Sequence, residues 1–286
     1  MRRNAARLLV IVPALLLALA SLSAAPQKPT FSTRVEAVRV DVLVTENGQP
    51  IRDLRPADFE VRDNGIVQQI DLASFEYIPL NVVLAFDASD SVTGERLEHL
   101  RTAGFGLLDG LLPQDRAALI TFNHVLSLGS LLTGSLDAVR QALRAITPGG
   151  GTALYDATYA GLVLGESDAG RTLLLLFTDG TDTSSYLARE TVLNIAQRTE
   201  VVVYAVAAGN PTAFEKDIVK QTGGARIRVE ATADLPKVFA GILQEFRERY
   251  VLSYSPRGVA SGGWHQIDVR VKGRRVVVKA RAGYQR

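Results

Sequence analysis

The sequence predicts an α/β protein with a doubly wound, mostly parallel, Rossmann-like sheet and a small β module built from both chain ends. Between residues 80 and 248, short apolar runs alternate with segments of helical periodicity. That order implies parallel strands with helices on both faces of the sheet. Residues 34–77 and 250–286 instead show the alternation and turn dipeptides of antiparallel β structure.

The first flank carries clear strand and turn signals. Four alternating valines predict one buried face of a strand: Val38, Val40, Val42 and Val44. Asn47-Gly48 and Asn64-Gly65 are dipeptides that tolerate the positive φ angles of tight hairpin turns.

The last flank offers three further strands, at Tyr250–Tyr254, Trp264–Val271 and Val276–Ala280. Its large aromatic residues are expected in a core: Tyr250, Tyr254, Trp264 and Tyr284. Each flank is too short to bury a good core alone. We therefore expect the N-terminal β segment, 34–77, to pair with the C-terminal β segment, 250–286, in one sandwich-like module.

The central region is expected to form one domain over residues 80–248. Its apolar runs predict buried strands at Val82–Phe86, Ala117–Phe122, Leu173–Phe177, Val201–Ala207 and Ile227–Val229. Its periodic segments predict helices at Leu97–Leu112, Leu136–Ile146, Leu154–Leu164, Leu187–Arg198, Ala213–Gln221 and Leu235–Arg249.

The first 25 residues have the pattern of a secretory signal peptide. Arg2, Arg3 and Arg7 precede the apolar run Leu8–Ala20, and small residues follow. The run is shorter than the roughly 20 apolar residues that a spanning helix needs. We therefore expect a signal peptide over residues 1–25, export to the periplasm or the extracellular space, and no permanent membrane anchor.

Charge and cysteine content exclude several classes of function. Without the three N-terminal arginines, 29 basic residues stand against 30 acidic ones, so no nucleic-acid-binding charge is present. The chain has no cysteine, which excludes disulfides, thiolate metal sites and cysteine nucleophiles. From Tyr250 onward, however, eight Lys or Arg face one acid, Asp268. These residues form either the solvated face of the strands or a contact for an anionic surface, such as lipid or an acidic protein.

Three polar segments stand at the carboxyl ends of predicted strands or in a loop beside one. They are Asp87-Ala88-Ser89-Asp90-Ser91, Gly149-Gly150-Gly151-Thr152 and Thr178-Asp179-Gly180. Ligands of open α/β sheets bind in the crevice outside the carboxyl ends of the strands. Five side chains would bring oxygen there: Asp87, Ser89, Ser91, Thr152 and Asp179. An all-oxygen set favours a hard divalent cation, Mg²⁺ first, with Mn²⁺ and Ca²⁺ as rivals.

Other interpretations of these residues are weaker. Either aspartate alone could cap a helix or stabilise a turn, but all five in this order favour a metal site. The glycine run lacks the lysine of a phosphate-binding loop, so nucleotide binding is not expected. His99, His124 and His265 lack the spacing of metal ligands, and His99 is expected to be exposed on its helix. The sequence also offers no catalytic triad.

The five residues resemble the metal-ion-dependent adhesion site (MIDAS) of the von Willebrand factor type A (VWA) family. The family pattern is D-x-S-x-S, then a threonine after glycines, then T-D-G, and it matches in that order. The resemblance covers residues 80–248. The flanking segments Asp58-Phe59-Glu60-Val61 and Arg281-Ala282-Gly283-Tyr284 resemble the bacterial group called VWFA-related (acidobacterial type).

The resemblance implies a sheet of about six strands and a defined role for each site residue. Ser89 and Ser91 would bind the metal directly, and Thr152 directly or through water. Asp87 and Asp179 would act mostly through bound waters. One coordination position would remain for an Asp or Glu of a protein partner. Many relatives have glycine where this chain has Asp90, whose carboxylate either weakens recruitment of an anionic ligand or lies in solvent.

The function expected from the sequence is an exported, non-enzymatic, metal-dependent protein-binding module for adhesion or scaffolding. A Mg²⁺-dependent hydrolase is the first alternative, but only Asp90 is available as a general base. A structural protein of envelope assembly with a vestigial site is the second alternative. A measurement of metal affinity distinguishes the structural protein with a vestigial site from the binding module. Turnover of a substrate distinguishes the hydrolase from the binding module.

Overall fold

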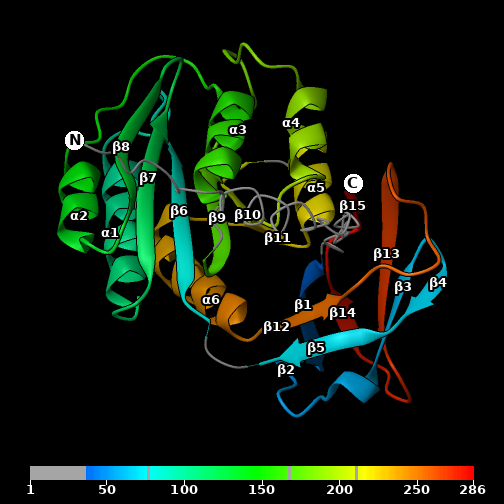
Figure 1. Cartoon of the computed structure of the whole chain (residues 1–286). Helices are drawn as coiled ribbons and strands as arrows, with labels where there is room; N and C mark the ends of the chain where they lie inside the picture. Colours follow the sequence, from blue (N-terminus) through cyan, green and yellow to red (C-terminus); the bar gives the residue numbers. More distant parts are fainter. Residues whose placement is uncertain (1–36, 76–77, 167–168, 210–211) are drawn as a thin grey trace, which may run out of the picture. The chain divides into compact units, whose positions relative to one another are not determined.

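The computed structural model describes residues 37–75, 78–166, 169–209 and 212–286. The expected signal peptide and residues 34–36 of the first flank lie outside this part of the chain. No helix within the described ranges is long and apolar enough to cross a membrane. The predicted fold class is confirmed: a mostly parallel central sheet with helices on both faces, and antiparallel sheets built from both chain ends (Figure 1).

The central sheet has six strands in the order β11-β10-β9-β6-β7-β8. All neighbours are parallel except β8, which is antiparallel to β7. The strands are β6 (Leu80–Asp87), β7 (Arg116–Phe122), β8 (Leu126–Thr133), β9 (Arg171–Thr178), β10 (Val202–Ala207) and β11 (Ala225–Arg228). The sequence predicted each of them except the edge strand β8.

Helices cover both faces of the sheet, and every residue of the central strand β6 is therefore buried. On one face, Val82, Leu84 and Phe86 share a core with α1 (Glu95–Asp109), α2 (Leu136–Arg144) and α6 (Leu235–Arg247). On the other face, Val83 and Ala85 share a core with α3 (Leu154–Gly165), α4 (Arg189–Ala196) and α5 (Ala213–Thr222). All six predicted helices form.

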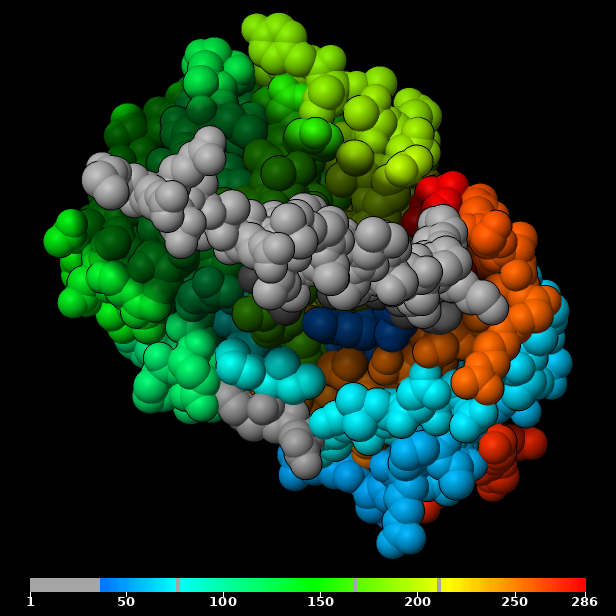
Figure 2. All heavy atoms as spheres, viewed as in Figure 1, coloured from blue at the N-terminus to red at the C-terminus, as the bar shows by residue number. Residues whose placement is uncertain are grey.

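The two flanks pair with each other in two antiparallel sheets with the orders β14-β1-β12-β5 and β15-β13-β3-β4. The first flank supplies β1 (Val38–Glu46), β2 (Gln49–Pro50), β3 (Phe59–Asp63), β4 (Ile66–Gln68) and β5 (Ile70–Ser74). The last flank supplies β12 (Tyr250–Tyr254), β13 (Trp264–Val271), β14 (Val277–Lys279) and β15 (Gly283–Gln285). Blue and cyan atoms of the first flank lie among orange and red atoms of the last (Figure 2). Asn47 and Asn64 adopt positive φ angles, as expected for the two hairpin turns.

The core of this β module contains a polar centre that joins the two flanks. Asp63 of β3 accepts hydrogen bonds from the hydroxyls of Tyr254 at 3.0 Å and Tyr284 at 2.9 Å. The Nδ1 atom of His265 lies 2.8 Å from the other carboxylate oxygen. Burial of these tyrosines agrees with the prediction, but Trp264 is 40% exposed because it stands on the outer face of β13.

Candidate metal site

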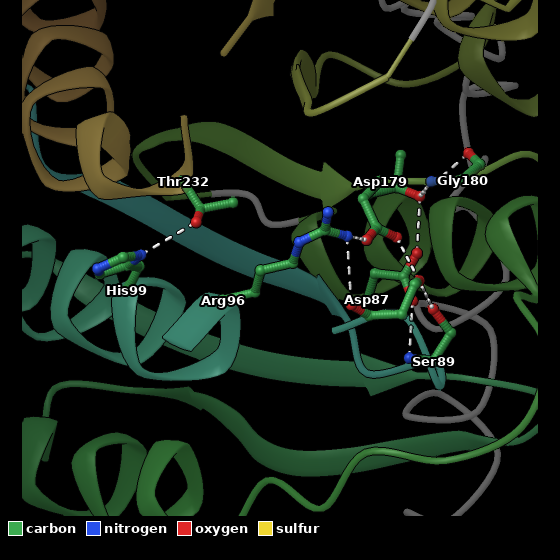
Figure 3. A network of polar contacts seen from close by, with 9 residues as sticks. Asp87, Ser89, Arg96, His99, Asp179, Gly180 and Thr232 are labelled. Carbon is green, nitrogen blue, oxygen red and sulfur yellow. Dashed lines mark hydrogen bonds and ion pairs between the residues drawn. The ribbon is translucent and has the colours of Figure 1, made fainter. Parts of the chain in front are cut away.

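The carboxyl ends of β6 and β9 bring the first and third polar segments together. The two strands are parallel neighbours with Phe86 opposite Phe177, so Asp87 and Thr178 end adjacent strands. The backbone N–H of Gly149 donates to the carbonyl oxygen of Ala88 at 2.9 Å, which brings in the second segment. The three segments therefore converge as the sequence predicted, and Figure 3 shows residues of the first and the third.

Asp87 is the most deeply buried residue of the cluster, with none of its surface exposed. Its Oδ1 accepts the N–H of Ser89 at 2.9 Å, and its Oδ2 accepts the hydroxyl of Thr178 at 2.7 Å. Burial raises the pKa of the Asp87 carboxyl, these hydrogen bonds oppose the rise, and the charge of Asp179 adds to it. Within the described residues Asp87 has no ion pair. A cation beside it would remove the cost of this buried charge.

Three more oxygen-bearing side chains form a chain of hydrogen bonds with Ser91 in the middle. The hydroxyl oxygens of Ser89 and Ser91 are 3.1 Å apart, and Ser91 donates to Oδ1 of Asp179 at 2.6 Å. Neighbouring ligands of an octahedral Mg²⁺ ion lie about 2.9 Å apart, given Mg–O distances of about 2.0–2.1 Å. These oxygens are in direct hydrogen-bond contact, and they are also close enough together to be shared by one small cation.

Thr152 faces the same cluster from the start of α3. A Cβ built on Gly180 would lie 3.7 Å from the Thr152 hydroxyl oxygen, so this hydroxyl reaches the third segment. The threonine backbone is fixed there: its N–H donates to Thr183 Oγ1 at 2.9 Å, and its carbonyl accepts the N–H of Thr183 at 2.8 Å. Glycine is required two residues before it, because Gly150 has φ +79° and a Cβ there would meet His124 Nδ1 at 2.0 Å.

Asp90 is exposed to solvent, as one of the two expectations had it, but its carboxylate also contacts the second segment. Its Oδ1 accepts the N–H of Gly150 at 3.0 Å, and its own N–H donates to the Gly150 carbonyl at 3.0 Å. The side chain therefore joins the first segment to the second. Such a contact helps to fix the position of the segment that carries Thr152.

Sequence reasoning missed two residues of the site, Thr178 and Arg96. Thr178 belongs to the T-D-G motif, and its buried hydroxyl orients Asp87. Arg96 reaches from α1 to the cluster, where its Nη1 donates to Asp179 Oδ2 at 2.8 Å (Figure 3). The sequence did hold a signal for Arg96, because a basic residue in the first turn of a helix opposes the helix dipole.

The histidines supply no ligand to this cluster. His99 is half-buried rather than exposed, and its Nδ1 lies 3.0 Å from Thr232 Oγ1, away from the cluster (Figure 3). Nowhere in the described ranges do three or more His, Cys, Asp or Glu side chains gather in a way that could hold a metal. Any ion at this edge of the sheet must therefore use hydroxyl oxygens together with the two carboxylates, and this donor set fits Mg²⁺ or a similar cation.

The fold and this arrangement agree with a family assignment. The model of the von Willebrand factor type A domain matches residues 81–239, more than half of the chain, so the chain belongs to that family. An uncharacterized protein of Synechocystis sp. is 33% identical over 113 residues, which are 36% of this chain and 26% of that protein. Inter-alpha-trypsin inhibitor heavy chain H4 of Bos taurus is 28% identical over 145 residues, 46% of this chain and 16% of that protein. The chain thus matches about a quarter or less of the length of these relatives.

Solved structures share the fold at low sequence identity. Proximal thread matrix protein 1 of the mussel byssus, with a zinc-occupied MIDAS motif, aligns with a TM-score of 0.54 and 16% identity. That alignment covers 63% of this chain and 48% of the other. The vWF domain of the type V pili tip protein Mfa5 from Porphyromonas gingivalis aligns with a TM-score of 0.50 and 15% identity. It covers 64% of this chain and 98% of the other.

Proposed function

We propose that the protein is an exported, non-enzymatic binding module that uses one divalent cation to hold a carboxylate of a protein partner. The ion would be held by Asp87, Ser89, Ser91, Thr152 and Asp179. The observation that carries the proposal is the fully buried Asp87 carboxylate, which has no ion pair within the described residues and lies among hydroxyl oxygens.

The donor set also defines what the bound ion can do. Mg²⁺ is the first choice, with Mn²⁺ and Ca²⁺ as rivals, because every donor is oxygen. Two carboxylates balance the charge of the ion and neutral hydroxyls add none, so an open coordination position remains electrophilic. A carboxylate of the partner gains a charge-assisted bond there, whereas a neutral amide gains much less.

The segment that follows β9 is suited to supply specificity. Tyr186 is 96% exposed, so its ring is available to a partner. The backbone beneath it is fixed, because the Asp156 carboxylate accepts the N–H groups of Tyr186 and Leu187, each at 2.9 Å. A rigidly held, exposed aromatic residue is a favourable anchor for a protein interface.

The relatives and the chain ends give further support. The names of two fold neighbours place them in a byssus thread and at a pilus tip, which fits adhesion or scaffolding. The signal pattern of residues 1–25 favours the periplasm or the extracellular space. Contact of the basic last flank with an anionic surface has less support, because Arg270, Arg274 and Lys279 pair with acidic residues: Asp268, Asp53 and Glu245.

Titration calorimetry with Mg²⁺ and Mn²⁺ tests the metal site. The wild type should bind one ion, and Asp87→Ala and Asp179→Ala should each lose roughly 100-fold or more in affinity. Asp109→Asn is the matched control, because this exposed carboxylate lies at the far end of α1 and should leave affinity unchanged. Equal affinity in the wild type and Asp87→Ala would exclude this set of ligands.

A pull-down from envelope extracts, run with Mg²⁺ and again with EDTA, tests the bridge. A partner should be retained with Mg²⁺ and lost with EDTA or with Asp179→Ala. Its interface Asp and Glu residues are then changed to Ala one at a time, and one such change should abolish binding. Full binding by every partner variant, or by the wild type in excess EDTA, would show that the metal is not the bridge.

A further inference from the structure

Arg96 is the one cationic side chain that contacts the oxygen cluster within the described part of the chain. Its Nη1 donates to Asp179 Oδ2 at 2.8 Å and to the Ser91 carbonyl oxygen at 3.3 Å. The Asp179 side chain is only 4% exposed, whereas that of Arg96 is 52% exposed. The guanidinium thus lies at the solvent edge of the site and covers one oxygen of Asp179 (Figure 3).

The position of Arg96 in the chain is unfavourable for a cation. Helix α1 begins at Glu95, so Arg96 stands in its first turn, at the positive end of the helix dipole. A cation there is destabilising unless nearby anions compensate; Glu95 and Glu98 lie in the same turn, and Asp179 is the anion with which Arg96 makes an ion pair. The pair therefore depends on the charge of the same carboxylate that the proposed metal ion would use.

A divalent ion and Arg96 compete for Asp179. One oxygen of this carboxylate accepts the Ser91 hydroxyl at 2.6 Å, inside the cluster, and the other accepts Arg96. An ion in the cluster would withdraw charge from Asp179 and repel the guanidinium. At about 6 Å in a water-like dielectric, this repulsion corresponds to roughly a 10-fold change in the dissociation constant of the ion.

We propose that Arg96 is a built-in competitor of the divalent cation: it closes the metal-free site by pairing with Asp179 and moves toward solvent when the ion binds. The inference rests on the proposed function, because it assigns regulation to the same site. Arg96 and Ser91 both reach the surface, so the released guanidinium lies where a partner approaches. The metal-loaded site then offers a carboxylate two cationic groups, the ion and Arg96.

Calorimetry with Mg²⁺ and Mn²⁺ on the full chain tests the competition. Arg96→Gln should bind the ions roughly 10-fold more tightly, because the repulsion is removed. Arg96→Lys keeps the charge and should stay within about 3-fold of the wild type. Arg140→Gln is the matched control: this arginine also pairs with carboxylates, Asp109 and Asp137, but it lies by the far end of α1, about 20 Å away. Its removal should leave ion affinity unchanged.

A second readout follows the side chain itself. The NMR signal of the Arg96 Nε–H group, assigned by its loss in Arg96→Gln, should shift and exchange faster with water when Mg²⁺ saturates the wild type. Equal or weaker ion binding by Arg96→Gln, with normal binding by the wild type, overturns this inference and leaves the proposed function standing. Absence of binding in every variant overturns both. Binding by Arg96→Gln alone supports the inference, because Arg96 then excludes the ion from the wild type.

Discussion

Strands β6 and β9 run side by side, and their two ends carry opposite kinds of polar chemistry. At the carboxyl ends, the carboxylate of Asp87 is buried and makes no ion pair within the described residues. At the amino ends, Arg171 is almost as deeply buried, but its Nε donates to Asp41 of β1 at 2.7 Å and its Nη2 donates to the Phe246 carbonyl at 2.9 Å. The buried carboxylate of Asp87 thus has no counter-charge within the described residues, whereas the buried guanidinium of Arg171 has one in Asp41.

Two further buried arginines at the amino ends differ from Arg171: within the described residues their hydrogen-bond acceptors are uncharged, and Nε and Nη1 of Arg249 have no hydrogen-bond partner. Arg249 donates to the Gly223 carbonyl at 2.8 Å and to the Tyr204 hydroxyl at 2.9 Å. Arg281, near the last strand, donates to the Gln197 carbonyl at 3.0 Å. Arg249, directly before β12, and Arg281, just before β15, therefore join the β module to the central domain.

The difference between the two ends of these strands indicates where a charged side chain can be replaced without loss of the fold. At the junction, where the β module meets the central domain, Arg171 and Asp41 are ion-pair partners inside the protein, so removing one leaves the other without its counter-charge. Asp87 has no ion-pair partner within the described residues, so removing its charge should affect ion binding and spare the fold. Substitutions at the two ends should therefore separate stability from ion affinity.

The largest effect is expected from Asp41→Asn at the junction. The change leaves the Arg171 guanidinium buried without its carboxylate, which costs about 3–5 kcal/mol in the free energy of unfolding. Urea unfolding measures this loss, and calorimetry with Mg²⁺ should show unchanged ion affinity in the variant while it is folded. A large loss of ion affinity at equal folded fraction would break the separation between the two ends.

Asp87→Asn, at the site, should have the opposite effects: ion affinity should fall, and the stability of the metal-free protein should not. Ion affinity should fall roughly 100-fold or more, because a neutral amide replaces a carboxylate. Since burial raises the pKa of Asp87, the fold favours the neutral form, and the metal-free variant should be more stable by an amount on the order of 1 kcal/mol. Urea unfolding in EDTA measures that gain. A metal-free variant less stable than the wild type would mean that the Asp87 charge supports the fold.

A smaller effect is expected at Asp90, where two variants distinguish the contact from the charge. Asp90→Ala removes the acceptor of the Gly150 N–H and should weaken ion binding by about 5- to 10-fold, near 1 kcal/mol. Asp90→Asn retains an acceptor oxygen and should stay within about 3-fold of the wild type. Calorimetry on both is the test. Equal losses in the two variants would assign the effect to charge.

The fold was largely predictable because its signals are local. Runs such as Val82–Phe86 are apolar throughout, since helices cover both faces of these strands. The missed strand β8 lies at an edge, is mostly exposed and pairs irregularly with β7, so its sequence lacks a clean alternation. Trp264 was misplaced because alternation alone does not decide which face of β13 is buried.

The site was predictable as far as its motif extended. The sequence gathered five oxygen-bearing residues that the structure brings to one edge of the sheet, while their role as ligands stays a proposal. The contact of Arg96 with Asp179 and that of Asp90 with Gly150 could not be predicted, because each depends on the distance between segments that are 83 and 60 residues apart. A motif predicts which residue types stand at the ends of strands, but the charged residues that pair with them are determined by the tertiary structure.

The smallest effect is expected from Arg39→Gln, because this variant removes an exposed ion pair of the junction, in contrast to the buried pair of Arg171 and Asp41. Arg39 also joins the two parts, through Glu200 at 3.3 Å, but the two side chains are 41% and 52% exposed. Water screens such a pair, so its loss should cost less than about 1 kcal/mol in urea unfolding, and ion affinity should not change. In 1 M salt the difference from the wild type should shrink further, because exposed charges are screened. A loss as large as that of Asp41→Asn would mean that any contact between the two parts, and not burial of the charge, sets the stability of the junction.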